Sequence, residues 1–143
     1  MRRTDLVGFA ESVPIVQGKA WIGQLPDLPG LYAAVLGRPF SRLSGETDIL
    51  RIGQAGRQVA TTKGLVRRAT LRARWRSYWQ FPVLNDRDVR DVLRALLHNG
   101  ENIEIAYMVN DGPVEELRQR ERELLRRFFD DHLELPPLNR QKP

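Results

Sequence analysis

The sequence predicts an α+β domain in which helices pack on a small antiparallel sheet. Short apolar runs with strand character lie at residues 30–37, 47–53 and 103–109, and three longer stretches carry apolar residues at helical spacing. Along the chain these elements follow one another as strand, strand, helix, helix, strand, helix. At 143 residues the chain fits one domain, large enough to bury a core without disulfides.

The first two predicted strands can pair as a hairpin. They read "GLYAAVLG" (30–37) and "TDILRIG" (47–53), and a polar loop separates them. Residues 54–64 are small and polar, so we expect a loop there. The first twenty-odd residues give no clear prediction.

Three helices and one more strand complete the prediction. A helix is expected from about residue 65 to 79, because Pro82 cannot continue it. The amphipathic stretch 86–100 predicts a second helix, with acidic residues in its first turn. The run 103–109 alternates as a third strand, and a last helix is expected over about 113–132.

Composition indicates a globular protein with an unusual basic surface. The formal net charge is +5 and the sequence pI is about 10.2. Lysine occurs only at Lys19, Lys63 and Lys142, so arginine supplies almost all of the positive charge. The planar guanidinium suits phosphate better than the point charge of lysine does.

Other features exclude whole classes of site. The chain has no cysteine, which excludes disulfides and thiolate chemistry. No apolar run has the length of a signal peptide or of a membrane span, so we expect a cytoplasmic protein with no membrane partner.

A basic block points to a polyanionic partner. Between positions 63 and 76 all charged residues are basic, with Trp75 among them and Tyr78 and Trp79 just after. The block comprises Lys63, Arg67, Arg68, Arg72, Arg74 and Arg76, with Arg57 just upstream. Such a pattern favours nucleic acid. A solvated basic face is the plainer alternative.

Two charged residues lie on helix stripes that should face the core. In "LRARWRSYWQ" (71–80) Arg74 shares its stripe with Leu71, Trp75 and Tyr78. In the last helix Glu121 lies between apolar residues on the core-facing side. An unpaired charge inside would cost several kcal/mol. Either the two side chains form a structural salt bridge or reach solvent, or they converge on a polar site.

Taken together, "PGLYAAV", "DILRIG", "LRARWRSYW", "ERELLRRF" and "PPLN" resemble the GIY-YIG nuclease superfamily. The resemblance includes the N-terminal nuclease domain of the bacterial excision-repair nuclease and runs from Pro29 to Asn139. It implies a three-stranded antiparallel sheet flanked by helices. Residues 1–28 would then be an N-terminal extension and residues 29–143 the nuclease-like domain.

The resemblance also implies roles for single residues. Tyr32 would activate the attacking water, Arg74 would contact the scissile phosphate, and Glu121 would be the single metal ligand. Tyr78 stands where members carry tyrosine or histidine, and Asn139 would close the site by hydrogen bonding. Read alone, Tyr32 is equally a core tyrosine and Asn139 a turn residue.

The chain departs from the family pattern in three places. Arg51 replaces the second motif tyrosine, and it could hold Tyr32 toward the phenolate although it cannot accept a proton itself. The loop before Arg74 is longer than in compact members. The segment after Glu121 is also longer, so Glu123 is a second candidate ligand.

We therefore expect a DNA endonuclease that uses one Mg²⁺ or Mn²⁺ ion. Arg51 and Arg74 would offset charge on the phosphate. The expected DNA-binding residues are Lys63, Arg67, Arg68, Arg72 and Arg76. A protein partner could supply specificity. The alternatives are an inactive nucleic-acid-binding module of the same family and an α+β interaction protein with a basic face.

Overall fold

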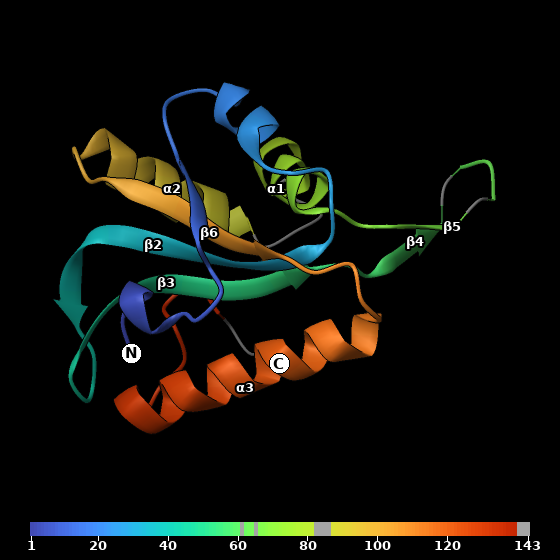
Figure 1. Ribbon diagram of the computed structural model, residues 1–143. Coiled ribbons are helices and arrows are strands. Elements are labelled where there is room, and N and C mark those ends of the chain that lie inside the picture. The colour runs from blue at the N-terminus through green and yellow to red at the C-terminus, as the bar shows by residue number, and fades with distance from the viewer. Residues whose placement is uncertain (61, 65, 82–86, 140–143) are drawn as a thin grey trace.

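The computed structural model is an α+β fold built on a four-stranded antiparallel sheet (Figure 1). It describes residues 1–60, 62–64, 66–81 and 87–139. The strand order is β1-β6-β2-β3, with β1 at Glu11–Pro14, β6 at Ile103–Val109, β2 at Gly30–Ser41 and β3 at Glu46–Ala55. The fold class and the antiparallel sheet flanked by helices are confirmed.

The predicted number of three strands is wrong, because the N-terminal segment adds β1 to the free side of β6. This segment also forms the short 3₁₀ helices η1 (Arg3–Asp5) and η2 (Ala20–Gln24). The Trp21 side chain of η2 is fully buried in the core. Residues 1–28 therefore share the sheet and the core of the rest of the chain.

The three predicted helices are α1 (Leu71–Gln80), α2 (Arg87–His98) and α3 (Val114–His132). α1 begins later than predicted, because β4 (Gln58–Ala60) and β5 (Val66–Arg68) form a hairpin within the expected loop and helix start. The Thr70 hydroxyl accepts a hydrogen bond from the Ala73 amide and so caps α1. The predicted helix starts at residues 65 and 86, the helix-ending Pro82 and residues 140–143 lie outside the described residues.

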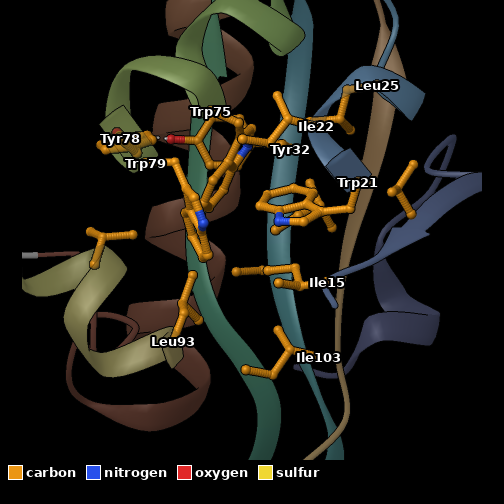
Figure 2. Packing of buried hydrophobic residues seen from close by; sticks show 14 of the residues in the cluster. Ile15, Trp21, Ile22, Leu25, Tyr32, Trp75, Tyr78, Trp79, Leu93 and Ile103 are labelled. Atoms are coloured by element: carbon orange, nitrogen blue, oxygen red, sulfur yellow. Dashed lines mark hydrogen bonds between the residues drawn. The ribbon is translucent and has the colours of Figure 1, made fainter. Parts of the chain in front are cut away.

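Helices cover both faces of the sheet (Figure 1). On one face, α1, α2 and η2 enclose the edge-packed rings of Trp21, Trp75 and Trp79 (Figure 2). On the other face, α3 packs Leu117 and Phe128 against strand residues. Among the described residues, no helix combines the length and the apolar character needed to cross a membrane.

Candidate active site

The sequence-predicted residues gather along the free edge of β3. This strand ends the sheet, and α1 and α3 reach it from opposite faces. The C-terminal segment runs along it: the Leu138 amide donates to the Leu50 carbonyl at 2.9 Å. The Asn139 side chain accepts from the Ile52 amide at 2.8 Å and donates to the Ile52 carbonyl at 2.7 Å. Asn139 thus closes the edge as a neighbouring strand would.

Tyr32 projects from β2 across β3 toward this edge. It pairs in register with Gly53, where a Cβ atom would clash with the Tyr32 ring and hydroxyl. Its ring packs edge-on against Trp75, with centroids 5.1 Å apart, and only 1% of the residue is exposed. Its hydroxyl lies 3.1 Å from the Tyr78 hydroxyl (Figure 2). Gly53 therefore provides the space that lets a β2 tyrosine reach the edge.

Arg51 links the two tyrosines to the C-terminal segment. Its Nη2 donates to the Tyr78 oxygen at 2.8 Å, its Nε lies 3.4 Å from the Tyr32 oxygen, and its Nη1 donates to the Leu138 carbonyl. Burial acts against the guanidinium charge, but the phenol oxygens of Tyr32 and Tyr78 outweigh it and raise the pKa of Arg51. Arg51 is therefore a permanent cation beneath the site.

Tyr78 is held between arginines. The Arg74 guanidinium lies 4.4 Å from its ring centroid and that of Arg51 5.3 Å away. Burial and the neighbouring Tyr32 raise the pKa of Tyr78, against the opposing effect of Arg51 and Arg74. The Tyr78 hydroxyl thus keeps its proton at neutral pH and can donate it to the Tyr32 oxygen.

Arg74 lies at the border of the helix stripe that the sequence places in the core. Leu71, Trp75 and Tyr78 on that stripe are buried, whereas Arg74 is half-buried. An open pocket of about 440 Å³ lies beside it, lined also by Gln54 and Arg57. The cation therefore faces a polar recess rather than the core.

Glu121 approaches from α3 and is half-buried. Burial raises the pKa of its carboxyl, and the guanidinium groups of Arg51 and Arg74 oppose this shift. The charges of both arginines therefore act on the Glu121 carboxyl. Within the described part of the chain its carboxylate accepts no hydrogen bond and has no cation within 4.0 Å, so the alternative of an Arg74–Glu121 salt bridge is not realised.

Glu123, the second candidate ligand, lies elsewhere. Its carboxylate accepts a hydrogen bond from Gln119 at 3.0 Å, and its side chain lines a different pocket, next to Phe9 and Met108. The arginines of the β3 edge act on Glu121, whereas Glu123 faces the pocket beside Phe9 and Met108.

One carboxylate is compatible with a magnesium-type ion only if other oxygens complete its shell. Among the described residues, no group of three or more His, Cys, Asp or Glu side chains could hold a metal. Mg²⁺ is commonly held by one or two carboxylates together with water and substrate phosphates. Glu121 fits that mode of binding, in which water and substrate complete the shell, and does not fit a site built from protein ligands alone.

The five basic residues expected to bind DNA fall into two groups. Lys63, Arg67 and Arg76 are exposed. Arg68 and Arg72 instead hold the fold together. Arg68 donates from Nε to the Gly56 carbonyl at 3.1 Å and from Nη1 to the Asp111 carbonyl at 2.7 Å. Arg72 donates from Nε to the Leu25 carbonyl at 2.9 Å.

Two further cations were not predicted from the sequence. Arg118 and Arg122 on α3 are exposed, and both lower the pKa of Glu121 against the effect of burial. In the sequence, the one indication that these arginines act on Glu121 is their position, since Arg118 lies three residues before it and Arg122 one residue after it.

The comparisons with known proteins give no relative. No protein-family model matches the sequence, no curated protein matches it, and no solved structure matches the fold. What the site can do follows from its geometry and its chemistry.

Proposed function

We propose that this protein is a divalent-metal-dependent endonuclease of the GIY-YIG type, which hydrolyses phosphodiester bonds in DNA. The observation that supports this most is the convergence at the β3 edge. Tyr32, Arg51, Arg74, Tyr78, Glu121 and Asn139 come from β2, β3, α1, α3 and the C-terminal segment. Hydrogen bonds, a ring contact and charge interactions link the first five, and Asn139 bonds to Ile52, next to Arg51.

The arginines are suited to bind the scissile phosphate. Arg51 and Arg74 flank the same tyrosine ring, so a phosphate near Tyr78 would meet positive charge from both. Fixed cations of this kind stabilise the charge that develops in phosphoryl transfer. Residues 49–85 carry eight basic residues and no acidic one, which favours the approach of a polyanion.

Tyr32 is the proposed general base. Its oxygen lies within reach of two donors, the Tyr78 hydroxyl at 3.1 Å and Arg51 Nε at 3.4 Å. In its phenolate form it would accept the proton of the attacking water as the new P–O bond forms and the bond to the leaving oxygen breaks. Because Tyr32 is only 1% exposed, water would reach this oxygen only after neighbouring side chains move.

Glu121 is the proposed protein ligand of Mg²⁺ or Mn²⁺, since it is a half-buried carboxylate on which the charges of Arg51 and Arg74 act. A bound divalent ion would offset negative charge on the phosphate oxygens. Arg118 and Arg122 would hold the DNA backbone on either side of it.

The test is plasmid nicking with Mg²⁺ or Mn²⁺ and with EDTA. We expect the wild type to nick supercoiled DNA only with metal. Glu121→Gln should lower the rate roughly 100-fold or more, as loss of one charge-stabilising group does. Glu123→Gln is the matched control and should nick like the wild type, because Glu123 faces another pocket. A Glu121→Gln variant with undiminished nicking would contradict the proposal.

A second candidate is a nucleic-acid-binding module that does not cleave. It is favoured by the burial of Tyr32 and Tyr78, whose hydroxyls both bond to Arg51. Duplex binding by the wild type, without nicking in either metal, would support it. Absence of any salt-sensitive DNA binding would instead favour a basic face that meets an acidic protein.

A further inference from the structure

The hairpin formed by β4, β5 and residues 62–64 projects from the body of the protein. It leaves the sheet after β3 and extends past the end of α1 (Figure 1). We call it the β4–β5 arm. Three strand residues extend about 10 Å at about 3.3 Å per residue. This length is close to the depth of the DNA major groove, about 8.5 Å, and a two-stranded ribbon fits its width.

The base of the arm is fixed to the body. The Ala69 amide donates to the Arg57 carbonyl at 2.8 Å, which continues the ladder of the hairpin. Arg68 ties the base to the Gly56 and Asp111 carbonyls. A Cβ atom at Gly56 would clash with Leu117, so α3 packs directly on the bend. The arm therefore has a set direction relative to the active site.

The other side of the arm carries positive charge. Arg68 faces the body through these contacts, so its neighbour Arg67 projects from the opposite side of the hairpin. Arg67 is exposed, as are Arg57 at the base and Lys63 near the tip. A ribbon with three exposed cations suits a groove walled by phosphates.

The arm and the active site share a recess. The open pocket beside Arg74 is also lined by Arg57, Gln58 and Ala69 at the base of the arm. A DNA strand bound along the arm would therefore pass Arg74.

We propose that the β4–β5 arm enters the major groove of duplex DNA and sets which phosphate reaches Arg74. Arg57, Lys63 and Arg67 would be the contacting side chains. This inference rests on the proposed nuclease function for its biological meaning, but binding alone tests it.

The experiment measures binding to a 30-base-pair duplex of random sequence, in EDTA so that no metal-dependent cleavage occurs. The arm variant replaces Arg57, Lys63 and Arg67 by Ala. The matched control replaces Lys19, Arg94 and Arg126, three exposed cations outside the arm. Each complex is also challenged with methyl green, which occupies the major groove, and with netropsin, which occupies the minor groove.

We expect the arm variant to bind roughly tenfold or more weakly, with a salt slope lower by about 2–3, and the control to change much less. Methyl green should displace the wild type and netropsin should not. Equal weakening of both variants, or displacement by netropsin alone, overturns the arm proposal while leaving the nuclease proposal standing. A wild type that binds no duplex overturns both. Binding as expected without nicking in metal supports the arm and rejects the nuclease.

Discussion

The two edges of the sheet are closed in different ways. At one edge, β1 has four residues and ends in Pro14. The Ile15 amide donates to the Ile103 carbonyl of β6 at 2.9 Å. Because backbone groups of successive residues in a strand point in opposite directions, the Pro14 nitrogen points away from β6, and it carries no N–H to bond another chain. At the other edge, β3 has ten residues, and the distant Leu138 and Asn139 bond to its backbone.

The difference shows where a site can form. A short edge strand that ends in proline offers few backbone groups to bond, so it needs no cover from other parts of the chain. A long edge must be covered by other parts of the chain. At β3 that cover is the Leu138 backbone amide, the Asn139 side chain and two helices, and polar side chains from both faces of the sheet meet beside them.

The largest expected effect is that of Gly53→Ala at the β3 edge. The new Cβ would overlap Tyr32, which Trp75 holds from the other side. We expect a loss of about 3 kcal/mol in the free energy of unfolding, measured by urea titration, and loss of nicking. Gly23→Ala is the control, since nothing lies within 4 Å of its Cβ position. Equal stabilities of the two variants would mean that Tyr32 does not depend on Gly53.

Asn139→Ala would reopen the β3 edge. It removes two hydrogen bonds to Ile52, each worth about 1 kcal/mol, so we expect a loss of roughly 2 kcal/mol in the same titration. Ser12→Ala on exposed β1 is the matched change at the other edge and should stay within about 0.5 kcal/mol. A comparable loss at both edges would remove the contrast between them.

A smaller effect is expected from the pH dependence of Glu121. Burial raises the pKa of its carboxyl, so the folded protein holds this proton more tightly than the unfolded chain does. Its contribution to stability is present at acidic pH and is lost as pH rises through the raised pKa. In EDTA, Glu121→Gln should match the wild type near pH 4 and be slightly more stable at pH 7.

Ionisation of Glu121 should also make the nicking rate depend on pH. Metal binding requires the carboxylate, so nicking with Mg²⁺ should increase as pH rises through the raised pKa of Glu121. A Glu121→Gln variant that is less stable than the wild type at pH 7 would indicate a structural ion pair instead.

The smallest expected effect concerns Pro14. Pro14→Thr restores an outward donor on β1 without changing the core, so the free energy of unfolding should change by less than about 0.5 kcal/mol. Self-association should rise, as measured by light scattering at increasing protein concentration. An unchanged monomer would show that the short length of β1 alone protects this edge.

The elements with strong periodicity were predictable from the sequence. The strands at 30–37, 47–53 and 103–109 and the body of each helix carry clear apolar patterns. β1 was missed because only Val13 of its four residues is buried. The β4–β5 hairpin is not predictable because strands of three residues are too short to show a period, and they depend on pairing with each other.

The site was predictable only in part. Arg74 and Glu121 are recognisable in the sequence because each is a charge on an otherwise apolar helix stripe, and both are half-buried in the structure. The structural contacts of Arg68 and Arg72 were not predictable, since they depend on where the Asp111 and Leu25 carbonyls lie in the folded chain. Tertiary contacts of this kind leave no pattern in the sequence.

The closure of β3 by Asn139 has a consequence during synthesis on the ribosome. The two bonded residues, Ile52 and Asn139, are 87 positions apart. At about 5–20 residues per second, a nascent chain that has completed β3 waits roughly 4–17 s before Asn139 is added. Throughout that interval a ten-residue strand presents an uncapped row of amides and carbonyls to other nascent chains. Slower translation of the segment between them would lengthen this exposure and increase co-translational aggregation.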